Sequence, residues 1–326
     1  MARAGLRTLF KTRNRALAKE IASLERAADL PSTILILGES GTGKDRLARA
    51  VHDVSSRVSR PFVRIDAANL SDDLFESELF GHERGAFTGA VSAKKGLLEV
   101  AEDGTVYLDE VSSLSPAAQA KFLRVLQEKT FRRLAGSVTH PFRGRMIVSS
   151  RRDLAGLVSQ GAFRDDFFYR IDVVSVRLPR LRERPEDVLP LARAFARRAA
   201  RAWDRPARRF TDAAEKTLQR HPWPGNVREL RNVIERLLLL TDDVVDGATA
   251  RQILAGRHGS AGGASELSGP LADRVSAFER EVVLAELQAH GYNVAETARA
   301  LGLERSHFYK KCQQLGIDVK AERSHA

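Results

Sequence analysis

The fold of this chain is decided by residues 34–45, which read ILILGESGTGKD. Four apolar residues predict a buried strand, the glycine-rich segment predicts a tight loop, and a helical period begins after it. In such a loop the backbone N–H groups converge on phosphate oxygens, the helix N-terminus adds partial positive charge, and the lysine reaches the β- and γ-phosphates. The predicted phosphate-binding loop consists of Gly38, Glu39, Ser40, Gly41, Thr42, Gly43, Lys44 and Asp45.

This loop departs from the generic motif at one position, because Asp45 stands where a Ser or Thr would ligate magnesium. A glycine-rich turn without a ligand is the alternative. Residues 104–110, GTVYLDE, supply the second half of a nucleotide site: an apolar strand that ends in two carboxylates. In a P-loop ATPase, Asp109 would hold Mg²⁺ directly or through water, and Glu110 would polarise the attacking water. A solvated Asp-Glu turn is the alternative. The occurrence of this motif together with the phosphate-binding loop favours a site for ATP hydrolysis.

Outward from these motifs, residues 31–180 alternate short apolar runs with helical patterns, which predicts an α/β fold with a parallel sheet covered by helices. The segments 34–37, 106–108 and 146–148 are expected to be buried central strands. Helical periods replace the strand signal from about residue 186 to 256. The expected divisions are an α/β subdomain at 1–180, a helical lid at 181–255, a flexible Gly/Ser/Ala-rich linker at 256–270, and an all-α domain at 271–326.

The composition is that of a globular protein: 326 residues, 43% hydrophobic, 29% charged, with a net charge of +11 that favours a polyanionic partner. The single cysteine, Cys312, excludes an intramolecular disulfide and fits a reducing compartment. No apolar run is long enough for a membrane span or a signal peptide, so we expect a cytoplasmic protein. Residues 299–311 carry a net charge of +3, and residues 193–209 a net charge of +6, for which solvated arginine is the simpler interpretation.

A third motif lies between the two halves of the phosphate site, where residues 78–90 read ELFGHERGAFTGA. This segment resembles the signature loop of the AAA+ activators of sigma-54 RNA polymerase, the bacterial enhancer-binding proteins. The resemblance continues through 119–128, 163–170, 178–184 and 223–232, covers about residues 10 to 242, and is extended to 317 by the C-terminal helices. It implies an AAA+ P-loop NTPase, and in that family the residue after the P-loop lysine is acidic, as Asp45 is.

The signature loop has glycines on both sides of an aromatic ring, so it can bend sharply and expose that ring to a partner. A buried turn is the alternative. By resemblance, the contact with sigma-54 is made by Gly85, Ala86, Phe87, Thr88, Gly89 and Ala90.

Three arginines acquire roles only through the resemblance. Arg164 and Arg170 match the arginine fingers that stabilise charge on the γ-phosphate of a neighbouring subunit, a role that requires an oligomer, expected to be a hexamer. Arg228, in the segment WPGNVR at 223–228, resembles the sensor arginine of the lid, and Asn226 is expected to cap the helix that starts there. Surface arginines are the alternative in each case.

Two positions depart from the family pattern near the nucleotide. Asp66 stands where an asparagine would partner the catalytic glutamate, and a carboxylate facing Glu110 would be repelled. Arg151 replaces an amide after the strand at 146–148, while Ser150 keeps a hydroxyl that could sense the γ-phosphate. We hypothesise that Arg151 offsets the negative charge of Asp66.

The C-terminal region predicts a helix at 293–301, a turn at 302–304 and a second helix at 305–315, a unit that resembles the Fis-type helix-turn-helix. Its expected core is Ala295, Ala298, Leu301, Leu303, Phe308, Cys312 and Leu315. The candidates for contact with duplex DNA are Arg305, Ser306, His307, Tyr309, Lys310 and Lys311.

Together these features predict an ATP-hydrolysing transcriptional activator that binds enhancer DNA and remodels sigma-54 RNA polymerase holoenzyme for open-complex formation. The alternative is a DNA-binding regulator whose AAA+ domain binds nucleotide without productive turnover, with Asp66 and Arg151 as the reason. Only about 30 residues precede Pro31, too few for a regulatory domain, so a separate regulatory protein or a truncated chain is expected.

Overall fold

The computed structural model describes residues 5–68, 71–204, 206, 208–241, 243–261, 279–280, 283–284, 286–287, 290–315 and 317. The chain divides into two compact units, 1–250 and 251–326, and each is described by itself.

The first unit is built on a five-stranded parallel sheet with the strand order β2-β5-β8-β1-β9. The strands predicted at 34–37, 106–108 and 146–148 are its three central ones, so that prediction is confirmed. The bounds are β1 Ile34–Leu37, β2 Phe62–Asp66, β5 Thr105–Asp109, β8 Arg145–Ser150 and β9 Val174–Arg177. Because all five strands run in the same direction, their carboxyl ends meet at one edge, where parallel sheets place ligand sites.

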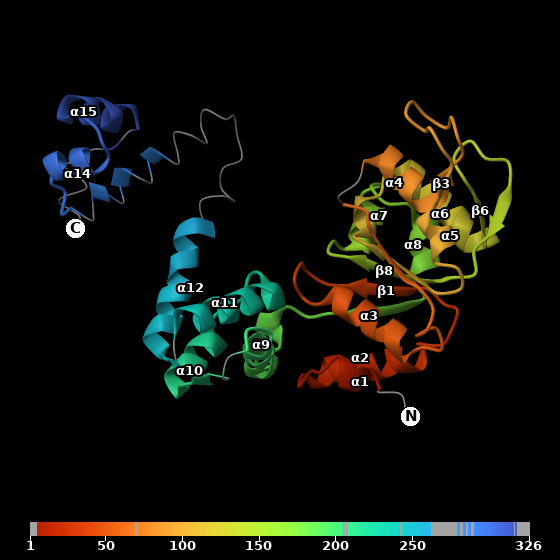
Figure 1. Cartoon of the computed structure of the whole chain (residues 1–326), viewed down its shortest axis with the longest axis horizontal. Helices are drawn as coiled ribbons and strands as arrows, with labels where there is room; N and C mark the ends of the chain where they lie inside the picture. The colour runs from red at the N-terminus through yellow and green to blue at the C-terminus, as the bar shows by residue number, and fades with distance from the viewer. Residues whose placement is uncertain are drawn as a thin grey trace. The chain divides into compact units, whose positions relative to one another are not determined.

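Helices cover both faces of this sheet (Figure 1). On one face lie α1 Leu6–Leu9, α2 Arg15–Arg26 and α3 Lys44–Val54; on the other lie α4 Asp72–Phe80, α5 Leu97–Val100, α6 Pro116–Glu128, α7 Leu154–Ser159 and α8 Asp165–Ile171. Successive strand residues point to opposite faces, so Ile34 and Ile36 pack with α1–α3 while Leu35 packs with the other layer. The layered α/β prediction is therefore confirmed.

Local sequence fixes where several of these helices start. The Asn14 side chain accepts a hydrogen bond from the Leu17 N–H and caps α2, and Ser115 does the same for α6 through the Ala118 N–H. At the far end of α2, the buried Arg145 guanidinium donates to the carbonyls of Ala27 and Ala28. Short two-stranded ribbons, β3 Gly81–His82 with β4 Lys94–Lys95 and β6 Thr130–Arg132 with β7 Thr139–Pro141, lie outside the main sheet.

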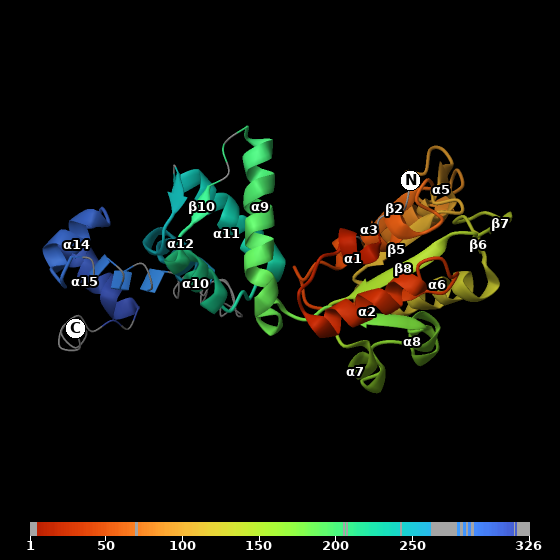
Figure 2. The ribbon, with the colours of Figure 1, turned by 90° about the horizontal axis from the view of Figure 1, so that it is seen from below.

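The helical part of the first unit follows β9 and two 3-10 turns, η2 Leu181–Glu183 and η3 Pro185–Asp187. Helix α9 Val188–Ala202 packs against α11 Asn226–Leu240, with α10 Asp212–Arg220 beside them (Figure 2). The buried stripe of α9 consists largely of alanines, which let α11 approach closely. A small parallel pair, β10 Arg209–Phe210 and β11 Val244–Val245, adds strand structure to a region predicted to be helical throughout.

Helix α12 Gly247–Ala261 extends past the predicted start of the linker at residue 256. The helix begins in regular lid sequence, and adding residues to a formed helix costs far less than starting one, so the first part of that stretch continues the helix. The rest of the predicted linker lies outside the described residues.

The second unit contains the helix-turn-helix, with α14 Val294–Ala300 and α15 Arg305–Gln314. Asn293 caps α14, and Phe308 and Cys312 lie in the core as predicted. Ala295, which was predicted to lie in the core, is exposed. The inward face of α14 consists of Thr297 and Ala298, which are both buried. Within the described residues, no helix is long and apolar enough to cross a membrane.

Candidate active site

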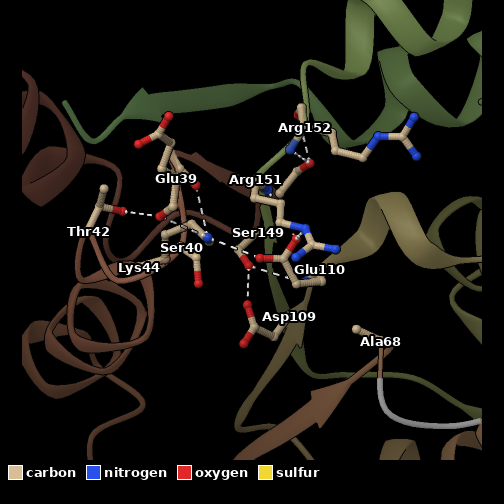
Figure 3. A network of polar contacts seen from close by, with 12 residues as sticks. Glu39, Ser40, Thr42, Lys44, Ala68, Asp109, Glu110, Ser149, Arg151 and Arg152 are labelled. Atoms are coloured by element: carbon tan, nitrogen blue, oxygen red, sulfur yellow. Dashed lines mark hydrogen bonds and ion pairs between the residues drawn. The ribbon is translucent and has the colours of Figure 1, made fainter. Parts of the chain in front are cut away.

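The predicted phosphate loop lies at the carboxyl edge of the sheet, between β1 and α3. Gly43 has a left-handed φ of +110° and forms the N-cap of α3, so the helix N-terminus faces the loop. Lys44 is buried and folds back over the loop, where its Nζ donates to the Gly38 carbonyl at 2.9 Å (Figure 3). The same Nζ lies 3.1 Å from Glu110 Oε1, so the loop and the end of β5 meet at one lysine.

The lid contacts this loop directly. Asn226 Nδ2 donates to the Ser40 carbonyl at 3.0 Å, and Arg228 Nη1 donates to the Ser40 hydroxyl at 2.8 Å. Arg184, which is buried, donates to the Thr42 carbonyl at 2.8 Å. Arg228 therefore lies beside the phosphate loop, as a sensor arginine must, whereas Asn226 points to the loop and does not cap its own helix.

Asp109 is buried at the end of β5 and accepts hydrogen bonds from Ser149, from Tyr107 and, at 2.6 Å, from Arg64. Burial alone would raise the pKa of Asp109, but the hydrogen bonds from Ser149, Tyr107 and Arg64 outweigh it and hold this pKa below its ordinary value. Asp109 is therefore an ionised carboxylate at neutral pH.

Asp45 belongs to the same polar cluster. It forms an ion pair with Arg64 at 2.8 Å and lies 3.0 Å from the Tyr107 hydroxyl. Arg64 and Tyr107 are cross-strand partners in the β2–β5 register, so both side chains lie on the face that Asp109 shares. Neither residue was predicted to belong to the site, because their proximity depends on a register that the sequence does not reveal.

Glu110 follows the strand with a left-handed φ of +58° and turns its carboxylate toward two cations. One is Lys44, and the other is Arg151, whose backbone N–H donates to Glu110 at 3.1 Å and whose Nε lies 3.7 Å away (Figure 3). Asp66 accepts from the Ala68 N–H and lies 3.9 Å from Arg64. The described contacts of Glu110 are thus attractive, and Arg151 pairs with Glu110 while the described ion pair of Asp66 is with Arg64, so compensation of Asp66 by Arg151 stays a prediction.

The two serines at the end of β8 differ in their contacts. The Ser150 hydroxyl exchanges hydrogen bonds with the backbone of Arg152, so it supports a local turn. The Ser149 hydroxyl contacts Asp109 and accepts from the Glu110 N–H. Successive strand residues face opposite sides, so Ser149 reaches the carboxylates, whereas the sequence pattern indicates a role for Ser150 alone.

A cavity of about 1410 Å³ opens beside the phosphate loop. Its lining includes Lys44, Asp109 and Glu110. The N-terminal segment and the lid contribute further arginines and the apolar side chains of Phe10, Leu191 and Val227. Cationic and apolar side chains in one cavity suit a ligand that carries both phosphates and an aromatic base.

The two predicted finger arginines lie outside that cavity, at the two ends of α8. Arg164 is exposed and makes a bidentate ion pair with Asp166 at 3.0 and 2.6 Å. Hydrogen bonding with Asp166 raises the pKa of Arg164. Arg170 is exposed and donates to the Leu126 carbonyl at 2.8 Å.

The predicted sigma-54 loop is a turn closed by hydrogen bonds from the Gly85 N–H to the Ala90 carbonyl and from the Ala90 N–H to the Phe87 carbonyl. Phe87 is 45% exposed and makes an edge contact with the His82 ring at 5.0 Å between centroids. Thr88 is exposed as well.

In the helix-turn-helix unit, the exposed face of α15 carries five of the six DNA candidates: Arg305, Ser306, His307, Tyr309 and Lys310. The sixth candidate, Lys311, is half-buried and forms an ion pair with Glu279 at 2.7 Å. Its position toward the inner side of the helix makes this intramolecular pair possible, and a DNA contact by Lys311 stays a prediction.

The predicted metal site can be tested against its donor set. Among the described residues, no group of three or more His, Cys, Asp or Glu side chains could hold a metal ion alone. Magnesium in nucleotide sites is commonly held by one or two carboxylates together with substrate phosphates. The ionised Asp109 beside the phosphate loop fits that arrangement.

A phosphate loop after the first central strand, two carboxylates after a second central strand, and a helical lid in contact with the loop define the AAA+ class of P-loop proteins. Within that class the chain belongs to the sigma-54 activator family. Residues 10–177 match the sigma-54 interaction domain, 182–254 the AAA+ ATPase lid domain, and 274–315 the Fis family of bacterial regulatory proteins.

Relatives extend over most of the chain. The Nif-specific regulatory protein of Azotobacter vinelandii is 42% identical over 301 residues, 91% of this chain and 57% of the relative. The alginate biosynthesis regulator AlgB of Pseudomonas aeruginosa is 40% identical over 93% of this chain and 66% of its own length. This chain thus spans less than two thirds of either relative. NtrX from Brucella abortus, solved in complex with ATP, matches with a TM-score of 0.71 and 35% identity over 97% of this chain and 70% of NtrX.

Proposed function

We propose that this protein is an ATP-hydrolysing activator that binds enhancer DNA and uses ATP to remodel sigma-54 RNA polymerase holoenzyme. The observation that carries the proposal is the convergence of Lys44, Asp109 and Glu110 in a cavity that the lid helps to line. The similar structure of NtrX, solved in complex with ATP, supports nucleotide binding by this fold.

In this proposal Lys44 binds the β- and γ-phosphates, and Arg228 contacts the phosphate end from the lid. Glu110 accepts the proton of the attacking water. Mg²⁺ would be held by Asp109 and would neutralise charge on the phosphates when bound.

Arg164 and Arg170 cannot act in their own cavity, because neither lines it. Both are exposed, as residues that reach into a neighbouring subunit must be. We therefore assign them to a homo-oligomeric ring, a hexamer in its active form, in which they stabilise the γ-phosphate charge of the next subunit.

The exposed loop with Phe87 and Thr88 is proposed to contact sigma-54, and α15 to enter the major groove of enhancer DNA. A solvent-exposed aromatic ring on a loop framed by glycines is better explained by a partner than by folding.

Steady-state ATPase activity tests the enzymatic part. Glu110→Gln keeps the size of the side chain but removes the base, so turnover should fall by about 10² to 10⁴ while nucleotide affinity is retained. Glu128→Gln is the matched control, since Glu128 is exposed and does not line the cavity. Equal turnover in Glu110→Gln and the wild type would refute the assignment.

A second candidate is a regulator that binds nucleotide without turnover, favoured by the pairing of Glu110 with Arg151. It predicts ADP and ATP binding with no turnover at any protein concentration. Open-complex formation by sigma-54 holoenzyme separates the two candidates: Thr88→Ala should abolish it, whereas Val91→Ala, in the same exposed segment, should not.

A further inference from the structure

Three successive carbonyls of the phosphate loop are held by residues of the lid. Ser40 C=O accepts from Asn226 Nδ2 at 3.0 Å, and Gly41 C=O accepts from the Val227 N–H at 2.9 Å. Thr42 C=O accepts from Arg184 Nη2 at 2.8 Å. Such a complete set of contacts on one side of a loop fixes the orientation of each peptide plane.

The orientation of those planes bears on phosphate binding. In a trans peptide unit the C=O and the following N–H point in opposite directions. Carbonyls directed at the lid therefore turn the following N–H groups away from it; those of Gly41 and Gly43 are the candidates for phosphate contact, because the Thr42 N–H donates to the Glu39 carbonyl at 3.3 Å. Backbone N–H groups turned to one side of a glycine-rich loop form an anion-binding concavity.

Asn226 is the member of this set with the most exacting environment. It is 1% exposed and has a left-handed φ of +53°, a conformation that asparagine tolerates better than most residues. Its Oδ1 accepts from the Leu181 N–H at 2.9 Å, so its Nδ2 faces the Ser40 carbonyl and, at 3.4 Å, Glu39 Oε2. One donor and one acceptor are both required, and only an amide supplies them at this length.

We propose that Asn226 is a positioning residue that acts through the phosphate loop and sets how strongly the site prefers nucleoside di- and triphosphates over monophosphates. Arg184, at the end of η2, supports the same loop by holding the Thr42 carbonyl. The proposal rests on the nucleotide site proposed above, and it assigns to the lid a role in shaping the loop itself.

The test is the binding of ADP and AMP to the full chain, measured by competition against a fluorescent ADP analogue. Asn226→Asp keeps the size, the left-handed tolerance and the acceptor for Leu181, but places an oxygen opposite Ser40 and Glu39. We expect the ADP affinity to fall by about tenfold or more and the ADP-to-AMP preference to fall with it. Asn232→Asp makes the same change at an exposed position of α11 and should leave both affinities unchanged.

Two results would overturn the proposal: an unchanged ADP affinity in Asn226→Asp, or an equal loss for ADP and AMP, which would indicate general damage to the site. If Asn226→Asp does not fold, Arg184→Met removes the donor to Thr42 while keeping the side-chain stem, and the same loss of ADP preference is expected. Absence of any nucleotide binding by the wild-type chain would instead refute the proposed function.

Discussion

The hydroxyl of Tyr107 provides a sharp test of the cluster around Asp109. It lies 3.0 Å from Asp109 Oδ1 and 3.0 Å from Asp45 Oδ1, while its ring is fully buried. Tyr107→Phe removes this hydroxyl and leaves the ring in place, so no large cavity forms in the core.

The expected loss of stability follows from the partners that remain. A hydrogen bond to a charged group contributes about 1.5–3 kcal/mol. In Tyr107→Phe, Asp109 still accepts from Ser149 and Asp45 still pairs with Arg64, so neither carboxylate is left unpaired. The free energy of unfolding should therefore fall by about 1.5 kcal/mol, near the lower end of that range.

The loss should also depend on pH. The lowered pKa of Asp109 contributes stability that is present above the unfolded-state pKa of about 3.9 and is lost as the pH falls through the folded-state pKa. Removing the Tyr107 donor raises the folded-state pKa of Asp109, so the difference in unfolding free energy between Tyr107→Phe and the wild type should shrink below about pH 4.

Urea unfolding followed by tryptophan fluorescence measures this, because both tryptophans, Trp203 and Trp223, lie in the first unit. Tyr169→Phe is the control, since Tyr169 is 74% exposed. A Tyr107→Phe variant as stable as the wild type at pH 7, or a Tyr169→Phe variant that loses as much, would refute the reasoning.

Three further outcomes are expected. Burial lowers the pKa of His52, so the folded state disfavours protonation of this side chain, and the free energy of unfolding should decline as the pH falls below about 6.5. Unfolding measured from about pH 5 to 8 should show a shallower decline in His52→Asn than in the wild type. Gly41→Ala should lower both the unfolding midpoint and ADP affinity, because residue 41 has a φ of +78° and the added Cβ would lie 2.5 Å from the Gly225 carbonyl oxygen. Arg151→Asn should change the ATPase rate by different factors in the wild-type and Asp66→Asn backgrounds; equal factors would refute charge compensation.

The sequence was sufficient to predict what depends on local pattern. Apolar runs identified β1, β5 and β8, and the order of strand, glycine loop and lysine identified the phosphate loop. Motif spacing likewise placed Asp109 and Glu110 after a central strand. These features need no knowledge of which segments lie side by side.

Local sequence patterns did not predict the contacts that depend on strand register or on the position of the lid. Arg64 reaches Asp45 and Asp109 because β2 pairs with β5 in one particular register. Asn226 was expected to cap a helix, as asparagines at helix starts often do, yet its left-handed backbone turns the side chain to the phosphate loop. Long-range geometry decided both positions.

The position of Lys44 between the loop carbonyls and Glu110 has a consequence for the timing of the reaction. The ion pair directs one carboxylate oxygen of Glu110 toward the lysine ammonium, so one of the lone pairs that could accept a proton from water is occupied. A triphosphate that draws the ammonium group toward its own oxygens releases that oxygen as it binds. In the proposed reaction the same lysine thereby couples the release of the base to the arrival of the substrate, since the cation that holds Glu110 is the one that the phosphates attract.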